Sequence, residues 1–578
     1  MRTKSGLTLA VLAGVGLIGV GAVMAATPKN TFVEILQDIP ATLDPSQAYD
    51  TGSAQPIENV YEQLLGYKGA DIKALVPLVA SDYKPSQGAK VWTFTVRKGI
   101  KFQNGDTLTC DDAAYTFRRA VIINNANSWG GTVLGGTLFG STDNAKDNPA
   151  ITWDRIEKAI SCNGEQLVFK LVSPDASFPY KMAFTSAGII SRKYASGGGE
   201  WSGTEKDWKA WIGKDLQEAN GFLHNNMMGS GAYQFVSKNP TQYLFKAFDG
   251  YWAGKAKLEN VIMQVIPEEA TRILALQKGD GDSPGGTLSR PALEQFKGVA
   301  GVKVTDEIAN LAAQAVFMNQ SIKDPSALAP GKLDEKGVPA NFFSDLNVRK
   351  GFAHAYDYER DIKEIRLGKA KRRTMALPES FLGYDANIPK ITHNPELAKT
   401  AFKKAWGGKL WDTGFTAVIK YNQGNSTRKR ISELLKANIE ALNPKFHLEV
   451  QVVPFAQFLQ EQQASKLSLS VGGWNPDYPD PDNYIPIFYG SSKVGGYYSP
   501  ATNFENKTID NAIEQARKIV EPAKREALYK LIGRVAAQEV PIILLPSGIN
   551  FLIVRDEVKG AYYNNVLSGI YLWKDLSK

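Results

Sequence analysis

The amino-acid sequence predicts a mixed α/β protein made of several domain-sized units. Segments with the two-residue periodicity of strands alternate with segments of helical periodicity along most of the chain, which is the pattern of α/β proteins. The chain has 578 residues, more than one hydrophobic core usually serves, so we expect about three to four units. Its apolar content of 43% and charged content of 22% are those of an ordinary globular protein, so neither a disordered nor a membrane-embedded chain is expected.

The first 25 residues have the layout of a secretory signal peptide. Arg2 and Lys4 form a positively charged start, Leu7 to Val23 is an uncharged apolar run, and Val23-Met24-Ala25 resembles a cleavage site. Glycines interrupt the apolar run, which disfavours a lasting membrane helix. The first cysteine is Cys110, so the pattern for lipid attachment near the cleavage site is missing. We therefore expect a soluble periplasmic protein that is cleaved near Ala25.

Strand and helix signals follow one another in the first third of the chain. Val91 to Arg97 alternates apolar and polar side chains, as half-buried strands do, and Gln166 to Val172 is expected to form another strand. Between them, Thr109 and Asp112 have the spacing of a helix N-cap and its partner three residues later. The apolar face of that helix would consist of Ala113, Phe117, Ala120 and Val121.

Further elements are predicted in the second half of the chain. A helix that begins at Ser426 or Thr427 should end at Asn443-Pro444, because the residue before a proline disfavours helical geometry. Two more helices are expected near Ile509–Val520 and Lys524–Gln538. The apolar run Pro541–Pro546 is typical of a buried strand.

The two cysteines, Cys110 and Cys162, predict a disulfide. Export places them in an oxidising compartment, where paired thiols usually become bridged. Two separate buried thiols are the alternative. A bridge that closes a loop of this length would stabilise the fold by about 4 kcal/mol in the chain-entropy model.

Several other functions find little support in the sequence. The net charge of +8 is spread over the chain without a long basic run, so we expect no nucleic acid partner. Gly14-x-Gly16-x-x-Gly19 matches a dinucleotide fingerprint but lies inside the export signal, so no cofactor is expected. Gly281–Gly285 matches a nucleophile-elbow pattern without the strand, turn and helix around it, and a secreted hydrolase is only a remote alternative. The four histidines are scattered and two cysteines cannot build a typical zinc site, so we expect no catalytic residues and no metal.

Six segments, taken in order, resemble one family. Val91–Ala120 is similar to the hallmark stretch of the peptide- and nickel-binding receptors of ABC importers, solute-binding family 5. Five more segments agree with that family: Ala41–Ser53, Gly229–Phe235, Ala275–Asp282, Leu346–Ile362 and Trp474–Tyr484. The resemblance spans nearly all of the chain after the signal peptide, and six ordered motifs are far more specific than any one alone.

The resemblance implies a two-lobed periplasmic-binding-protein fold of the class II, cluster C type, with a hinge and an extra small domain. Such proteins close on their ligand by a hinge motion. The implied division is a signal peptide at 1–25, lobe I at 26–70, 185–300 and 540–578, the small domain at 71–184, and lobe II at 301–539.

The segment Trp474–Tyr484 is the strongest candidate for ligand contact. In peptide-binding members of the family a similar segment supplies an aspartate that pairs with the α-amino group of the ligand, and Asp477 matches that position by its spacing from Trp474. A carboxylate in a closed cleft is a strong partner for a buried ammonium group. We also assign Trp474 and Tyr478 to the ligand site. The alternatives are a surface acidic turn or a calcium loop, although the central glycine of an EF-hand loop is absent.

Two further groups of residues are candidates with open alternatives. Thr51, Gly52 and Ser53 lie in a loop that borders the cleft in the family, or they form a plain turn. Asn422 and Asn425 could bond to ligand peptide groups or only cap the helix that follows them. A cationic segment could meet a ligand carboxylate, although solvated surface charge is the simpler interpretation: Lys369, Lys371, Arg372 and Arg373.

The resemblance implies a receptor rather than an enzyme. We expect a monomer that captures a short peptide between its lobes and passes it to the transmembrane permease subunits of an ABC importer. Because relatives in the family take other cargo, and aromatic and acidic side chains also suit sugars, an oligosaccharide or other non-peptide cargo is the alternative.

Overall fold

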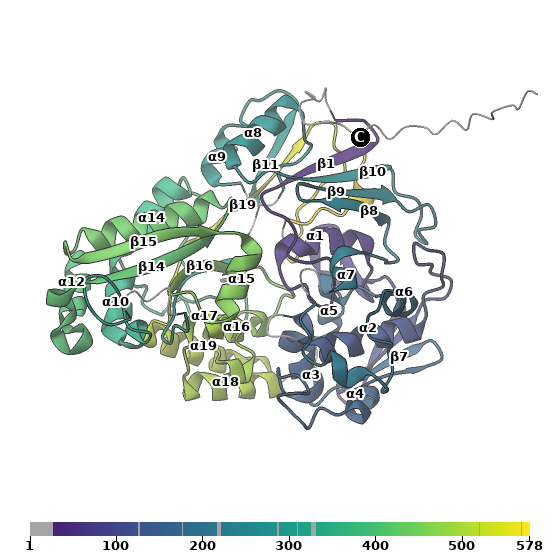
Figure 1. Cartoon of the computed structure of the whole chain (residues 1–578), viewed down its shortest axis with the longest axis horizontal. Helices are drawn as coiled ribbons and strands as arrows, with labels where there is room; N and C mark the ends of the chain where they lie inside the picture. The colour runs from purple at the N-terminus through teal and green to yellow at the C-terminus, as the bar shows by residue number, and fades with distance from the viewer. Residues whose placement is uncertain are drawn as a thin grey trace, which may run out of the picture.

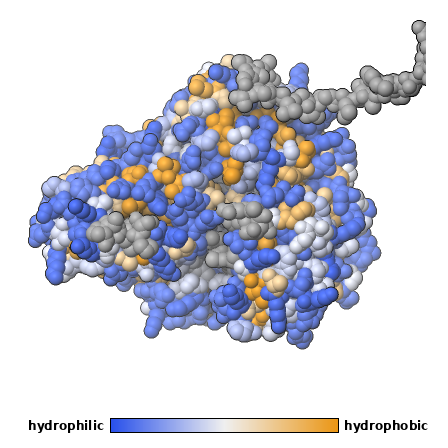
Figure 2. Space-filling view, in the orientation of Figure 1, coloured by the Kyte–Doolittle hydropathy of each residue, from blue (hydrophilic) through white to orange (hydrophobic). Residues whose placement is uncertain are grey.

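In this computed structural model, the described residues are 27–124, 128–175, 177–216, 221–285, 288–308, 310–324, 331–519, 521–567 and 569–578. The predicted signal peptide lies outside them. Figure 1 shows the elements gathered in two lobes, one mainly purple to teal and the other mainly green to yellow-green, with the yellow C-terminal segment lying against the first. On the face drawn in Figure 2, hydrophilic residues predominate and hydrophobic ones form separate small groups. Among the described residues, no helix has the length and apolar character needed to cross a membrane.

The first lobe contains a four-stranded sheet with the order β1-β10-β9-β8. Strand β1 (Thr31–Leu36) runs parallel to β10 (Asn260–Val265), and β9 (Gln242–Ala247) and β8 (Tyr233–Asn239) continue the sheet antiparallel. Parallel pairing of β1 with β10 joins segments more than 200 residues apart, so this lobe is assembled from distant parts of the sequence.

A smaller four-stranded sheet, β4-β5-β7-β6, forms a separate unit on the first lobe. Its strands are β4 (Ala80–Ser86), β5 (Val91–Val96), β7 (Gln166–Lys170) and β6 (Ile160–Asn163). Helix α2 (Cys110–Ile123) follows β5 and begins with the predicted capping box, in which Thr109 and Asp112 bond to each other's backbone amides. The predicted apolar face of α2 is buried.

The predicted disulfide is confirmed. Cys110, the first residue of α2, is bonded to Cys162 in β6, and their Cα atoms are 6.0 Å apart. The bridge therefore ties the start of the helix to the edge of the small sheet.

The second lobe is built on a five-stranded sheet with the order β15-β14-β16-β12-β17. Strands β14 (Phe415–Asn422) and β15 (Phe446–Val453) run parallel on either side of α14 (Ser426–Glu440) in the chain. The sheet is completed by β16 (Leu469–Trp474), β12 (Ala313–Met318) and β17 (Ile542–Leu544). Helices α10 (Leu346–Ala355), α12 (Pro395–Lys404) and α14 pack on it around a phenylalanine-rich core.

The lobes are connected by segments that pair with each other. Strand β11 (Val302–Ile308) pairs antiparallel with β19 (Asn550–Arg555), and β13 (Ala370–Lys371) pairs with β18 (Ser547–Gly548). Strand β17 belongs to the second-lobe sheet, although we expected residues 540–578 in lobe I. The domain boundaries stay a prediction, but this pairing favours a later end for the second lobe.

The predicted helices of the second half of the chain are present. Helix α14 begins at Ser426, as predicted, and ends at Glu440, before the predicted end at Asn443-Pro444. Its N-cap is Asn425, whose side chain accepts a hydrogen bond from the Arg428 amide. Helices α18 (Lys507–Lys518) and α19 (Pro522–Glu539) are both present, with Pro522 as the first residue of α19.

The remaining helices and strands are short or lie on the surface of the two lobes. The helices of the first lobe are α1 (Thr51–Val60), α3 (Gly136–Phe139), α4 (Trp153–Ala159), α5 (Phe178–Lys181), α6 (Arg192–Gly197), α7 (Phe222–Asn225), α8 (Glu269–Lys278) and α9 (Arg290–Glu294). The others are β2 (Leu65–Lys68), β3 (Asp71–Pro77), α11 (Tyr358–Arg360), α13 (Leu410–Thr413), α15 (Phe455–Gln463), α16 (Ile485–Tyr489) and α17 (Ser499–Thr502).

Candidate ligand-binding site

A cavity of about 280 Å³ lies between the two lobes. The first lobe contributes the start of α1 and the residues just before it, and the second lobe contributes the end of β16 and the starts of α14 and α15. Much of the wall is apolar or aromatic, as expected of a site that binds a small organic molecule. The aromatic lining residues are Tyr49, Phe184, Phe455, Phe458, Trp474, Tyr497, Tyr498 and Tyr563.

Asp477 faces this cavity from the second lobe and is only 5% exposed. Its Oδ2 atom accepts hydrogen bonds from the Tyr49 hydroxyl at 2.7 Å and from Asn483 Nδ2 at 2.8 Å. Among the described residues, Oδ1 accepts no hydrogen bond and no cation pairs with the carboxylate. Burial raises the pKa of Asp477 to about 7, because the two neutral donors offset only part of the cost of removing its charge from water.

The Asp477 carboxylate is held by a small network around Asn483. Asn483 Oδ1 accepts hydrogen bonds from the Asp477 backbone amide at 2.7 Å and from Trp474 Nε1 at 3.1 Å. Tyr49 reaches the same place from the first lobe, and its ring packs edge-on against Trp474 with the centroids 5.4 Å apart. One bond to Asp477 therefore comes from each lobe, so the geometry at this carboxylate depends on closure of the lobes.

Arg428 is a cavity residue that the sequence did not reveal. It lies in the first turn of α14, and its Nη1 atom donates to Asn422 Oδ1 at 2.7 Å, while its buried Nε has no hydrogen-bond partner among the described residues. Burial lowers the pKa of Arg428, and no carboxylate in the described part of the chain pairs with it. In the sequence, Arg428 is marked only by its position three residues after the N-cap Asn425. Charged residues occur at that position in many helices.

Of the two predicted asparagines, Asn425 lines the cavity, and Asn422 supports a residue that lines it. Asn425 caps α14 and also lines the cavity, so its contact with a ligand stays a prediction. Asn422 is 1% exposed and lies outside the cavity lining, where it orients Arg428.

The Thr51–Ser53 segment forms the first turn of α1 instead of a loop. Thr51 lines the cavity, as does Asp50, which caps the helix. Gly52 lies close to Asp50 Oδ1 and the Phe455 ring, where an added Cβ would be 3.2 Å from the carboxylate oxygen. Ser53 is fully buried, and its hydroxyl accepts a hydrogen bond from the Thr42 amide.

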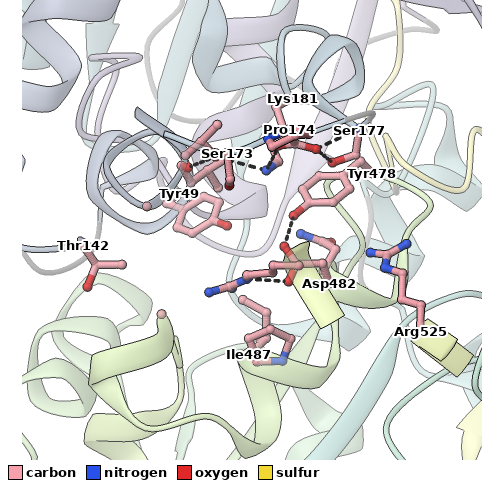
Figure 3. A pocket seen from close by; sticks show the side chains of 18 residues that line it. Tyr49, Thr142, Ser173, Pro174, Ser177, Lys181, Tyr478, Asp482, Ile487 and Arg525 are labelled. Atoms are coloured by element: carbon pink, nitrogen blue, oxygen red, sulfur yellow. Dashed lines mark hydrogen bonds and ion pairs between the residues drawn. The ribbon is translucent and has the colours of Figure 1, made fainter. Parts of the chain in front are cut away.

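Tyr478 points away from this cavity into a neighbouring chamber of about 100 Å³. Figure 3 shows that chamber, with Lys181 and Ser177 of the first lobe facing Tyr478 and Asp482 of the second. The Lys181 ammonium lies 5.5 Å from the centre of the Tyr478 ring. Tyr478 thus forms part of the contact between the lobes on the far side of Asp477.

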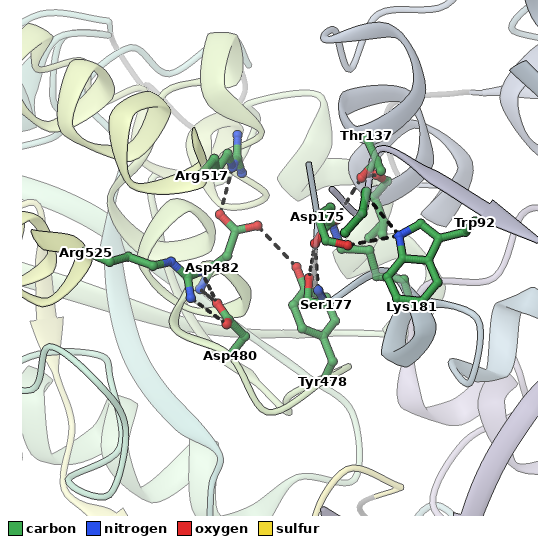
Figure 4. Close-up of polar contacts among 12 residues, drawn as sticks. Trp92, Thr137, Asp175, Ser177, Lys181, Tyr478, Asp480, Asp482, Arg517 and Arg525 are labelled. Atoms are coloured by element: carbon green, nitrogen blue, oxygen red, sulfur yellow. Dashed lines mark hydrogen bonds and ion pairs between the residues drawn. The ribbon is translucent and has the colours of Figure 1, made fainter. Parts of the chain in front are cut away.

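The other two aspartates of the segment are held by arginines in the second lobe. Asp480 pairs with Arg525 at 2.6 Å and Asp482 with Arg517 at 2.7 Å, as Figure 4 shows. Neither aspartate lines the larger cavity. Of the three carboxylates, only Asp477 faces that cavity without a cationic partner.

The cationic segment and the elbow-like segment have other roles in the fold. Arg373 donates to the Asn310 carbonyl at 2.9 Å, and Arg372 bonds to the Ile391 carbonyl, both outside the cavity lining. Ser283 is buried and donates to the Tyr571 hydroxyl at 2.6 Å. Among the described residues, no group of histidines, cysteines or acidic side chains could hold a metal ion.

Comparison with known proteins identifies the family. A sequence model described as "Bacterial extracellular solute-binding proteins, family 5 Middle" matches residues 74–496, which is well over half of the chain. The chain belongs to this family. The resemblance inferred from the six motifs is therefore confirmed. Because the family consists of transport receptors, the prediction that the chain is not an enzyme is confirmed as well.

Individual relatives match over nearly the whole chain. The dipeptide-binding protein of Escherichia coli (strain K12) is 23% identical over 560 residues, which cover 95% of this chain and 94% of the relative. Heme-binding protein A of Haemophilus influenzae is also 23% identical, over 552 residues, 93% of this chain and 90% of the relative. The names of these two relatives thus refer to different ligands.

Solved structures agree in fold. The periplasmic binding protein DppA from Helicobacter pylori, in complex with the peptide STSA, superposes with a TM-score of 0.77 at 20% identity, covering 95% of this chain and 98% of that one. MoaA from A. tumefaciens R10, in complex with mannopinic acid, gives 0.74 at 18% identity, covering 95% and 99%. The predicted two-lobed fold class is confirmed.

Proposed function

We propose that this protein is the receptor of an ABC importer and that it captures short peptides in the cavity between its lobes. The proposal includes export, removal of residues 1–25, a monomeric state and delivery of the cargo to the permease. Family membership supports the receptor role, and the names of several relatives, such as the dipeptide-binding protein of E. coli, support peptide cargo.

One observation carries the peptide assignment. Within the described residues, the cavity holds a buried carboxylate without a cationic partner, Asp477, and a guanidinium without a carboxylate partner, Arg428. A peptide with free ends supplies the two missing charges, an α-ammonium for Asp477 and an α-carboxylate for Arg428. Charge-assisted hydrogen bonds of this kind are among the stronger ones in proteins.

The size of the cavity indicates a short peptide. A volume of about 280 Å³ is just below the usual range of small-molecule pockets, which is about 300–1,000 Å³. The aromatic wall would surround an apolar side chain. Trp474 and Thr51 would contact the peptide directly. Tyr478, Ser53 and Asn422 lie outside the lining and would support the residues that form it.

A non-peptide cargo remains the second candidate because of the aromatic wall. Rings such as Tyr49, Trp474 and Tyr497 would also suit the faces of a sugar, and the related MoaA was solved with mannopinic acid.

Native mass spectrometry of exported protein, purified without unfolding, separates the two candidates. We expect a bound species whose fragments differ by amino-acid residue masses and whose mass corresponds to two or three residues. Hexose spacings, or an opine mass, would contradict peptide cargo. The same spectrum measures the mass of the mature chain, which should begin at Ala26 or Thr27.

A further inference from the structure

The charges that face the cavity do not balance. Of the described residues that line it, three are charged: Asp50, Asp477 and Arg428. None of them forms an ion pair within the described part of the chain. A closed cavity therefore contains two carboxylates and one guanidinium, each without a counter-charge.

Asp50 belongs to the first lobe and is half-buried just before α1. Its Oδ1 atom caps that helix by accepting a hydrogen bond from the Ser53 amide at 2.9 Å. Burial raises the pKa of Asp50, and the groups that act against this effect are neutral donors of Ser53 and Gly52, with no lysine or arginine among them. Among the described residues, no lysine or arginine forms an ion pair with this carboxylate, so only neutral groups oppose the effect of burial.

Capping alone does not require a carboxylate at this position. Asparagine and serine cap helices about as well as aspartate, and they would avoid the cost of burying a charge. The partial positive charge at the start of α1 offsets part of that cost. A cationic group that enters the cavity would offset the rest of that cost.

The two carboxylates belong to one cavity, because Asp50 and Asp477 both line it together with Tyr497. The Tyr497 ring packs on Tyr49 and Trp474 with the centroids 5.5 and 4.9 Å apart. The pKa of Tyr497 lies well above its usual value, mainly because of burial and then because of Tyr498, Asp50 and Asp477. A ligand in this cavity would therefore share it with both carboxylates.

We propose that the preferred cargo carries a second cationic group, and that Asp50 binds it. This inference rests on the proposed function: an α-ammonium pairs with Asp477, an α-carboxylate with Arg428, and a basic side chain with Asp50. A short peptide that contains lysine or a similar residue would then balance every charge that faces the cavity. Asp50 would be a specificity-determining residue, separate from the pair that holds the peptide ends.

Matched peptides test this inference. Lys-Leu and Leu-Lys are compared by calorimetry with their norleucine twins, which have the same straight side chain without the amine. We expect at least one lysine peptide to bind ten-fold or more tightly than its twin. In Asp50→Asn, which keeps the capping oxygen, the ratio between twins should fall to near one, and Asp50→Ser should give the same result. Asp82→Asn, at an exposed carboxylate in β4, is the control and should keep the wild-type ratio.

The possible outcomes separate failure of the Asp50 inference from failure of the proposed function. Equal binding of lysine and norleucine peptides, or a lysine preference that survives in Asp50→Asn, would overturn this inference and leave the peptide receptor intact. If none of the four peptides binds to wild type, the proposed function itself fails. Thermal melts of the two Asp50 variants check that α1 remains folded.

Discussion

At the scale of single residues, the ionisation of Asp477 predicts how binding depends on pH. Burial raises the pKa of Asp477 to about 7, and an ammonium ligand binds the charged form. Below pH 7 the carboxyl must first lose a proton, so affinity should fall by up to tenfold, about 1.4 kcal/mol, per pH unit. Above about pH 8 the peptide α-amino group begins to lose its own charge, so affinity should peak between these values.

Calorimetry of one dipeptide between pH 5.5 and 8.5 measures this profile, together with the number of protons released on binding. An N-acetylated twin, which has no ammonium group, should show no comparable loss at low pH. A flat profile for the free dipeptide would mean that Asp477 does not hold its amine.

Arg428 carries the prediction for the other end of the peptide. Arg428→Gln should weaken binding of a peptide with a free carboxylate by about 2–5 kcal/mol, because it leaves the ligand charge buried without a partner. Amidation of the peptide should weaken binding to wild type and have little further effect in the variant. Arg430→Gln, at an exposed position on the same helix, is the matched control. Equal affinity of wild type and Arg428→Gln for the free peptide would refute the assignment.

At the scale of residues, the sequence predicted Asp477 as a site residue but did not reveal Arg428. Asp477 follows Trp474 at a spacing that the family shares, within a segment that contains three prolines. Arg428 and Asp50 lie beside helix N-caps, where charged residues are common, and only the fold shows that both line the cavity. Tyr478 lines the neighbouring chamber rather than this cavity, and the direction of its side chain between Pro476 and Pro479 could not be predicted from the sequence.

At the scale of elements, the disulfide predicts a large loss of stability on reduction. The bridge links α2 to β6 across 52 residues, so in the chain-entropy model its removal should lower the free energy of unfolding by about 4 kcal/mol. Denaturant unfolding with and without reductant measures this, and a Cys110→Ala/Cys162→Ala variant is the control for effects of the reductant. Identical midpoints would show that the small sheet holds α2 without the bridge.

Local patterns predicted elements better than they predicted pairing. The capping box at Thr109 and the strand at Val91–Val96 were found because their signals lie within a few residues. The run between Pro541 and Pro546 was correctly expected to contain a buried strand, but β17 pairs with β12, more than 200 residues away. Which sheet a short strand joins depends on the tertiary arrangement of the chain, so periodicity alone could not assign it to the second lobe.

At the scale of the whole molecule, contacts across the cavity indicate a closed state. Tyr49 bonds to Asp477, Asp38 Oδ2 accepts from the Phe455 amide at 3.0 Å, and Ser426 donates to Glu269 at 2.6 Å. A ligand that binds both lobes favours this state through its differential affinity for closed over open forms. Small-angle scattering should therefore show a smaller radius of gyration when a peptide is added. An unchanged radius, with binding confirmed by calorimetry, would contradict closure by a hinge.

The most direct test of peptide binding at Asp477 compares Leu-Leu with N-acetyl-Leu-Leu by calorimetry. Wild type should bind the free dipeptide more tightly by about 2–5 kcal/mol, the usual effect of removing one partner of a buried charge pair. Asp477→Asn should lose most of that preference, while Asp480→Asn, whose carboxylate pairs with Arg525 outside the cavity, should keep it. If wild type binds both forms equally, or Asp477→Asn retains the full preference, Asp477 is not the receptor for the peptide amine.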